Sequence, residues 1–178
     1  MIKQAYFAGG CFWCTESIFQ RIRGVIEVVP GYMGGHIKNP AYREVCNGDT
    51  GHTETIKVLY EQDIISYGEL LEIFFLTHDP TTLNRQGNDV GSQYRSAIFY
   101  NDLDEKKQIE DCINRLDKEA VFENPIVTEI STAYPFYAAE IEHHNYYNQN
   151  TEQPYCQFVI TPKIKKLKSY FNQYTISE

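Results

Sequence analysis

The stretch QAYFAGGCFWCTESIFQRIRGVIEVV, residues 4–29, decides the class of the fold. Residues 4–9 are largely apolar and end at a glycine pair, so they predict a short buried strand. Residues 12–22 predict a helix because their apolar side chains recur partly at helical spacing, and residues 25–29 predict a second strand that the next Pro-Gly pair closes. A strand, a helix and a strand in so few residues predict a βαβ unit, which places Cys11 at the start of its helix.

The rest of the chain continues this mixture without a repeat, a linker or a shift in composition. Alternating or apolar runs predict strands at 53–60, 95–100 and 126–131. Amphipathic patterns predict helices at 67–78, 103–119, 138–148 and 162–173. We therefore expect a single domain over residues 1–178, of the α/β or α+β class.

One connection differs from the others. The sixteen residues Asp79–Tyr94, DPTTLNRQGNDVGSQY, carry no apolar period of a strand or of a helix. Loops of this length in compact domains are usually functional or disordered, and flexible linkers rarely mix Asn, Arg, Gln, Asp and Tyr in this way. We expect an ordered loop that forms part of a functional site.

Composition and charge exclude several classes of protein. The 178 residues are 42% hydrophobic and carry a formal net charge of -8, which suits a globular domain and argues against a nucleic-acid binder. No apolar run approaches the ~20 residues of a transmembrane helix, and the start MIKQAYFAGG does not resemble a secretory signal. The lysines at 163, 165, 166 and 168 predict a solvated helix face. We expect a cytoplasmic protein that does not bind membranes.

The cysteines point to thiol chemistry. Five cysteines cannot all pair within one chain, and two of them, Cys11 and Cys14, form a C-x-x-C pair. A thiol at a helix N-terminus faces unpaired N–H groups, so we expect the pKa of Cys11 to fall below the ~8.5 of a free thiol. A zinc half-site is the competing interpretation, but zinc needs two further ligands, and the sequence offers neither a second C-x-x-C nor an H-x-x-x-H.

Polar and aromatic residues near this pair suggest a substrate site. Phe12 and Trp13 stand between the two thiols, where they would either join the core or form a small apolar pocket for a methyl or thioether group. Glu54 takes the first inward position of the strand at 53–60, where burial would raise its pKa and make it a neutral acid. Tyr42 and Tyr94 add phenols that could donate hydrogen bonds.

At these residues the sequence closely resembles the A-type peptide methionine sulfoxide reductases. The strongest similarity lies in three stretches, and two weaker ones follow in family order across nearly the whole chain. The strong matches are GGCFWCTE (9–16), NPAYREVCNGDTGHTE (39–54) and DPTTLNRQGNDVGSQYRSAI (79–98), and the weaker ones are FYAAEIEHHNYY (136–147) and PYCQFVITPK (154–163).

The resemblance implies a ferredoxin-like α/β roll, with a mixed sheet flanked by helices and long functional loops. It implies that Cys11 attacks the sulfoxide sulfur and that Phe12 and Trp13 hold the methyl group of the substrate. It further implies that Glu54 and two phenols, Tyr42 and Tyr94, hydrogen-bond the sulfoxide oxygen, and that Asp89 orders the site. Because Ile141-Glu142 replaces the customary residues before His143, no role is carried over to Glu140 or His143.

The resemblance also implies the S-epimer of methionine sulfoxide as substrate, free or within proteins, and thioredoxin as the source of electrons. No metal or cofactor is expected, and we expect a monomer. Attack leaves a sulfenic acid on Cys11, which a second thiol converts to a disulfide. We favour Cys14 as this resolving thiol because closing so short a loop costs little; Cys156, which matches a resolving position in some relatives, is the alternative.

Two other classes compete with this interpretation. A thioredoxin-like disulfide oxidoreductase would also carry C-x-x-C after a strand, but Phe-Trp between the cysteines and the segments around Glu54 and Asp89 fit it badly. A metal- or protein-binding module without enzymatic activity would bind zinc stoichiometrically, or would leave its thiols unoxidised by a sulfoxide.

Overall fold

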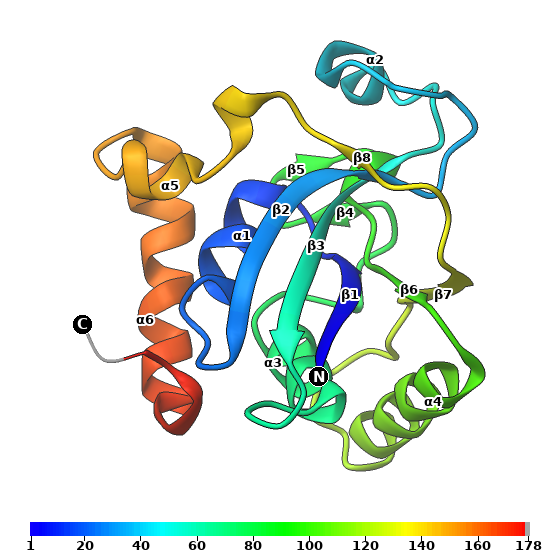
Figure 1. Cartoon of the computed structure of the whole chain (residues 1–178), viewed down its shortest axis with the longest axis vertical. Coiled ribbons are helices and arrows are strands. Elements are labelled where there is room, and N and C mark those ends of the chain that lie inside the picture. Colours follow the sequence, from blue (N-terminus) through cyan, green and yellow to red (C-terminus); the bar gives the residue numbers. More distant parts are fainter. Residues whose placement is uncertain (177–178) are drawn as a thin grey trace.

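The computed structural model describes residues 1–176, which form a six-stranded sheet with helices packed against it (Figure 1). The strand order is β7-β6-β1-β3-β2-β8, and a separate two-stranded hairpin is formed by β4 and β5. The strands are β1 (Ile2–Ala8), β2 (Val25–Met33), β3 (Thr53–Glu61), β4 (Arg85–Gln86), β5 (Asp89–Val90), β6 (Ala97–Tyr100), β7 (Glu129–Thr132) and β8 (Tyr137–Ala138). The α-helices are α1 (Phe12–Phe19), α2 (Tyr42–Cys46), α3 (Tyr67–Leu76), α4 (Leu103–Lys118), α5 (Tyr146–Gln149) and α6 (Thr161–Tyr170).

The topology confirms the ferredoxin-like core. Strand β3 pairs antiparallel with both β1 and β2, so β1 and β2 run parallel with β3 between them. The predicted βαβ unit is therefore a split one, in which α1 connects two strands that are not neighbours. Helix α3 then leads from β3 to β6, which pairs antiparallel with the other side of β1. The parallel pairing of β7 with β6 makes the sheet mixed.

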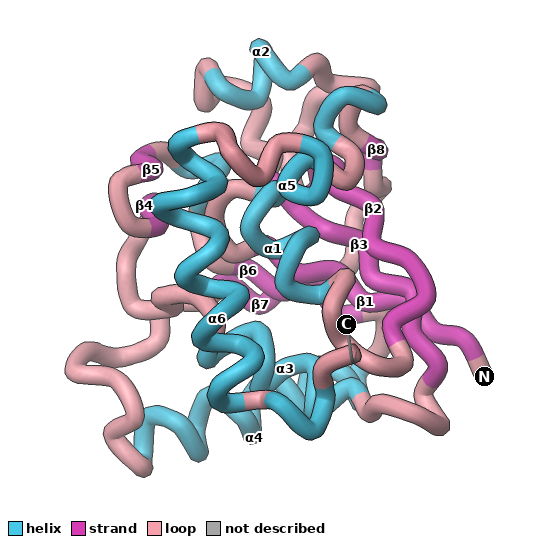
Figure 2. The backbone as a smooth tube through the Cα atoms, turned by 90° about the vertical axis from the view of Figure 1, so that its left-hand side faces the viewer, coloured by secondary structure: helices cyan, strands magenta, loops and turns pink. Residues whose placement is uncertain are grey.

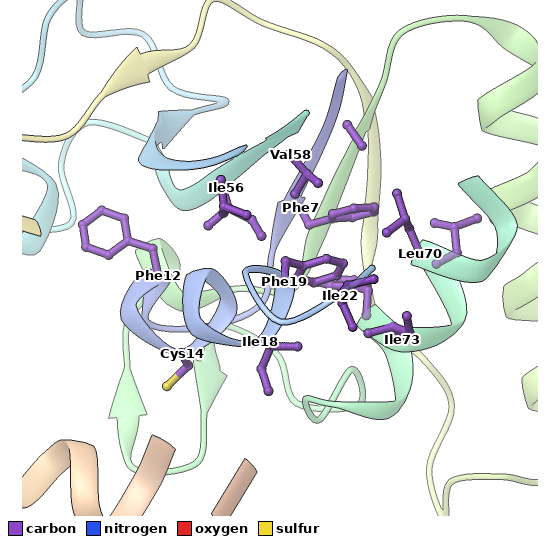
Figure 3. Close-up of a cluster of buried hydrophobic side chains, with 14 of the residues drawn as sticks. Phe7, Phe12, Cys14, Ile18, Phe19, Ile22, Ile56, Val58, Leu70 and Ile73 are labelled. Atoms are coloured by element: carbon purple, nitrogen blue, oxygen red, sulfur yellow. The ribbon is translucent and has the colours of Figure 1, made fainter. Parts of the chain in front are cut away.

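One face of the sheet carries the main core. The ring of Phe7 on β1 stacks on Phe19 of α1, with centroids 5.3 Å apart, and on Phe74 of α3 at 5.1 Å. A single side chain on the sheet thus touches both helices, which places α1 and α3 on the same face (Figure 3). Helix α6 packs beside α1 on this side, as Figure 2 shows. The cluster gives α1 a fixed position, and with it the cysteines of its first turn.

The predicted strand at 25–29 is longer in the structure and continues through Pro30 to Met33. The carbonyl of Pro30 accepts the N–H of Ala139 on the β8 side, so the missing proline N–H falls on that side and leaves the ladder with β3 intact. Because of this extension, Tyr32 lies directly opposite Glu54.

Two other predictions of secondary structure were wrong. Residues 138–148 do not form one helix: a 3-10 turn at Ile141–His143 precedes the short α5, and Asn145 between them has a left-handed φ of 56°. The loop Asp79–Tyr94 is ordered as expected, but it contains the β4–β5 hairpin and a 3-10 turn at Ser92–Tyr94. Patterns of hydrophobicity do not detect elements of two or three residues, because these are stabilised by contacts with distant segments.

Other predicted elements are present with shifted ends. The helix expected at 12–22 ends at Phe19, and the strand expected at 126–131 covers Glu129–Thr132. Helix α6 follows a π-helical turn at Cys156–Ile160. Within residues 1–176, no helix is both long and apolar enough to cross a membrane.

Candidate active site

The site begins at the turn from β1 into α1. Gly10 has a φ of +94°, a conformation that favours glycine, and a Cβ built on it would lie 2.6 Å from the side chain of Gln86. Gln86 in turn holds the backbone of Asp79 through two bonds, donating to its carbonyl at 2.8 Å and accepting its N–H at 2.9 Å. The glycine therefore lets the ordered loop pack directly against the turn that carries Cys11.

Glu54 joins the start of β3 to the start of α1. Its Oε1 accepts the N–H of Phe12 at 3.0 Å, which satisfies one of the unpaired donors at the helix N-terminus. Its Oε2 is buried and has no hydrogen-bond partner. One carboxylate oxygen therefore fixes the side chain, and the other is available to a bound ligand.

Burial makes Glu54 a neutral acid. The side chain is 1% exposed, and desolvation raises its pKa to about 8, against the opposing effect of the Phe12 N–H. The negative charge of Asp89 raises this pKa further. The carboxyl group is therefore largely protonated at neutral pH, as we expected for a buried glutamate at this position.

The thiols of Cys11 and Cys14 interact within the first turn of α1. Cys11 precedes the helix with ψ of 127°, and its carbonyl accepts the N–H of Cys14 at 3.0 Å. The prediction of a lowered pKa for Cys11 is wrong for the free protein: burial, the hydrogen bond to Cys14 and the charge of Glu54 raise it. The same hydrogen bond, assisted by the charge of Lys163, lowers the pKa of Cys14 to about 7. Of the two thiols, Cys14 thus ionises first.

Cys14 faces a cavity of about 260 Å³ between the β4–β5 hairpin and the C-terminal segment. Cys11, Asp89, Tyr155 and Lys163 also line this cavity. In Figure 3 the sulfur of Cys14 and the ring of Phe12 leave α1 in different directions. Lys163 is therefore not part of a purely solvated face, as the run of lysines suggested; its charge acts on the thiol pair.

Phe12 and Trp13 lie against a wall formed by residues 140–146. Phe12 is fully buried, with its ring centroid 5.4 Å from that of His143. Trp13 donates its Nε1–H to Nδ1 of His143 at 3.2 Å and stacks on Tyr146, with centroids 3.8 Å apart. Phe12 therefore belongs to the core, whereas Trp13 is only partly covered.

Glu16 ties this wall to α1. The side chain is 1% exposed, and its Oε2 accepts the N–H of Asn145 at 2.9 Å. The N–H of Tyr146 also hydrogen-bonds the carboxylate, although burial outweighs both bonds and raises the pKa of Glu16. The carboxylate of Glu16 thereby holds Tyr146, which stacks on Trp13. Trp13 lies one turn before Glu16 on α1.

The two predicted phenols lie near Glu54. Burial raises the pKa of both Tyr42 and Tyr94, and the charge of Glu54 adds to the increase for each. Tyr42 starts α2, where its N–H donates to Glu140 Oε2 at 3.0 Å and its ring lies 4.4 Å from His143. Both phenols therefore keep their protons at neutral pH and can act as donors.

Asp89 contacts the residue that precedes the π-helical turn. Its Oδ2 accepts the hydroxyl of Tyr155 at 2.6 Å, and the same hydroxyl lies 3.6 Å from Cys14 Sγ. Cys156, the next residue, is fully buried in the π-helical turn and carries a pKa raised mainly by burial. All five cysteines are free thiols in this structure.

Sequence reasoning missed four residues of the site. His143 and Glu140 were left without a role, although they hold Trp13 and Tyr42. Tyr155 and Lys163 were not singled out, because one tyrosine among 14 and one lysine in a basic run carry no local signal. Within the described residues 1–176, no cluster of three or more His, Cys, Asp or Glu side chains is arranged to hold a metal ion.

A ferredoxin-like core that presents two interacting thiols and a neutral carboxylic acid at one helix start defines a thiol-based oxidoreductase. The sequence model of the family described as "Peptide methionine sulfoxide reductase" matches residues 3–175. The chain belongs to this family.

Similar proteins agree with this assignment. Two similar proteins are named "Peptide methionine sulfoxide reductase MsrA". The one from Trichodesmium erythraeum is 52% identical, over 96% of this chain and 97% of its own length. The one from Deinococcus radiodurans is 53% identical, over 95% of this chain and 82% of its own length. Among solved structures, Mxr1 of Saccharomyces cerevisiae in reduced form is 33% identical, with a TM-score of 0.78 over 85% of this chain and 87% of that one. Mxr1 in complex with Trx2 is 25% identical, with a TM-score of 0.55 over 82% and 84%.

Proposed function

We propose that Cys11 is the nucleophile that reduces methionine-S-sulfoxide, free or in proteins, with Glu54 as the acid. The observation that carries this proposal is the unpartnered Oε2 of Glu54, which is buried beside the Cys11 turn and protonated at neutral pH. A neutral carboxyl group can donate its proton to the sulfoxide oxygen, which makes the sulfur a better electrophile. An ionised carboxylate could not.

Other side chains bind the substrate. Trp13 is only partly covered and offers apolar surface beside Cys11 to the methyl group and the thioether, and Phe12 contributes the buried ring next to it in the chain. Tyr42 and Tyr94 donate hydrogen bonds to the sulfoxide oxygen, for which their raised pKa suits them. Asp89 helps to order the site by accepting the hydroxyl hydrogen of Tyr155.

The first step transfers oxygen from the substrate to Cys11. The sulfur of Cys11 attacks the sulfoxide sulfur and forms an S–S bond, while the sulfoxide oxygen takes the proton of Glu54. This S–S bond and the S–O bond of the substrate then break as the oxygen moves to the Cys11 sulfur, which releases methionine and leaves a sulfenic acid on Cys11. The thiol proton of Cys11 restores the acid form of Glu54. The substrate sulfur gains two electrons and the Cys11 sulfur loses two.

A disulfide between Cys11 and Cys14 then completes the intramolecular chemistry. We favour Cys14, because its thiol already interacts with that of Cys11 at the start of α1. Strain in an i, i+3 bridge is relieved because Cys11 lies before the helix, with ψ of 127°. Cys156, fully buried in the π-helical turn, is the alternative.

Thioredoxin would re-reduce this disulfide, and the complex of the related Mxr1 with Trx2 supports that partner. The reaction needs no resident metal or cofactor, because the electrons come from thiols. A reducing compartment such as the cytoplasm suits a chain with five free cysteines. One six-stranded sheet and the main core packed on it support a single domain over 1–178, and we propose that this domain acts as a monomer.

The test is single-turnover release of methionine from each epimer of the sulfoxide by the pre-reduced protein. We expect one equivalent of methionine from the S-epimer and none from a Cys11→Ser variant. Mass mapping after one turnover identifies the disulfide. Release by Cys11→Ser would refute the nucleophile, and a Cys11–Cys156 bond would refute Cys14 as the resolving thiol.

A further inference from the structure

Three side chains form a hydrogen-bonded chain that ends at the second thiol. Cys14 lies in α1, Tyr155 immediately precedes the π-helical turn, and Asp89 lies in β5. The Tyr155 hydroxyl lies 3.6 Å from Cys14 Sγ and 2.6 Å from Asp89 Oδ2.

The direction of the two bonds follows from the number of protons. A phenol carries one hydrogen, and that of Tyr155 is donated to Asp89 at the shorter distance. The phenol oxygen therefore remains as an acceptor for the S–H of Cys14. The thiol of Cys14 thus donates to the Tyr155 oxygen, and the Tyr155 hydroxyl donates to Asp89. This is the arrangement of a proton relay, in which each proton moves along one hydrogen bond.

Cys14 has a proton to lose in a place where water has little access. Its surface is 3% exposed; the hydrogen bond to Cys11 lowers the pKa of Cys14 to about 7, while burial acts in the opposite direction, so below pH 7 most of the thiol keeps its proton. Formation of the disulfide requires that proton to leave as the sulfur attacks, since the thiolate is the nucleophile. Asp89 is only partly buried and lines the same cavity, so it can pass a proton on to solvent.

We propose that Tyr155 and Asp89 form the proton relay that activates Cys14 for attack on the sulfenic acid of Cys11. Tyr155 is then a catalytic residue of the disulfide-forming step, because its oxygen contacts a reacting sulfur, and Asp89 is the proton acceptor behind it. This inference rests on the proposed roles of Cys11 and Cys14.

The step balances in atoms and electrons. The S–H bond of Cys14 and the S–O bond of the Cys11 sulfenic acid break, and the Cys11–Cys14 S–S bond forms. The proton of Cys14 moves to the Tyr155 oxygen while the proton of Tyr155 moves to Asp89. Asp89 returns its proton through the cavity to the departing hydroxide, which leaves as water, so that the proton lost by Cys14 ends in that water. The Cys14 sulfur is oxidised by one electron and the Cys11 sulfur is reduced by one.

The ring of Tyr155 is held in place independently of its hydroxyl. It packs edge-on against Trp13, with centroids 5.9 Å apart. Tyr155→Phe therefore keeps the ring and removes only the relay oxygen. Asp89→Asn keeps an acceptor for the Tyr155 hydroxyl but removes the basic carboxylate.

The experiment follows two events in one turnover of the full-length protein: release of methionine, and loss of the sulfenic acid, trapped at intervals with a 1,3-diketone reagent. At pH 6, where most of the Cys14 thiol is protonated, we expect each variant to slow disulfide formation about 10-fold more than it slows methionine release. The double variant should be no slower than either single one, because both act on one path. Methionine release also shows that each variant is folded.

Tyr67→Phe is the matched control, because its hydroxyl is buried without a partner, and it should leave both events unchanged. Disulfide formation at the wild-type rate in Tyr155→Phe, or additive losses in the double variant, would overturn the relay. Neither result would affect the role of Cys11, which is tested separately by methionine release from Cys11→Ser.

Discussion

Glu54 Oε1 accepts the backbone N–H of Phe12 at 3.0 Å, and this one bond connects the start of β3 to the start of α1. The same contact orients the second oxygen, Oε2, so that it stays buried and unpartnered. An unpaired buried oxygen costs free energy, and protonation reduces that cost by removing the charge. The structural role of Glu54 and its acid character therefore have a common origin.

The first prediction separates these two roles. Glu54→Gln retains an oxygen for the Phe12 N–H but has no acidic proton, so we expect the rate of methionine release to fall by about 10²–10⁴-fold with little change in stability. Glu54→Ala leaves the Phe12 N–H unpaired and should also lower the free energy of unfolding by about 1–3 kcal/mol. Single-turnover kinetics and urea titration measure the two effects. Equal activity of Glu54→Gln and wild type would exclude Glu54 as the acid.

The second prediction concerns pH. The folded pKa of Glu54 is raised from 4.5 to about 8, so between these values the folded protein binds a proton that the unfolded chain has lost. The contribution of Glu54 to stability is therefore greatest below pH 4.5 and is lost as the pH rises to about 8.

Activity should follow the same group. The ratio of the single-turnover rates of wild type and Glu54→Gln should fall as the pH rises through about 8, because the wild type then loses its acid. The ionisation of Cys11 changes the rate of both proteins in the same way, so its effect cancels in the ratio. A ratio that stays constant from pH 6 to 10 would contradict the assignment.

The third prediction concerns the turn before Cys11. Gly10→Ala adds a Cβ in a left-handed conformation and 2.6 Å from Gln86, so it should cost about 1–3 kcal/mol of stability and displace the loop that carries Asp89. Gly48→Ala is the control, because Gly48 also has a positive φ, +80°, but a Cβ there would meet nothing within 4 Å. Denaturant unfolding of both variants isolates the clash. Equal losses for the two would mean that the contact with Gln86 is unimportant.

The fourth prediction concerns the wall beside Trp13. Glu16→Ala leaves the N–H groups of Asn145 and Tyr146 unpaired and loosens the stack of Tyr146 on Trp13. We expect a loss of about 1–3 kcal/mol in stability and a KM for the sulfoxide that rises more than kcat falls. Glu110→Ala, on the exposed face of α4, should change neither. An unchanged KM in Glu16→Ala would show that the wall does not contribute to binding.

Local sequence determined a large part of this protein. The strand–glycine–helix pattern of residues 4–22 and the alternation of 53–60 predicted the elements that carry Cys11 and Glu54, because burial on one face imposes a period on the chain. The C-x-x-C pair identified the thiols, and the polar content of Asp79–Tyr94 identified the ordered loop.

Only the tertiary structure decided how these parts act together. Strand β3 lies between β1 and β2, and Asn145 interrupts the helix expected at 138–148, because distant segments compete with local propensity. The sequence placed Cys11 at a helix start and so favoured a lowered pKa, whereas burial, Cys14 and Glu54 together raise it. Ionisation depends on every charge and dipole within a few ångströms, whatever its place in the chain, and for Cys14 these include Tyr155 and Lys163.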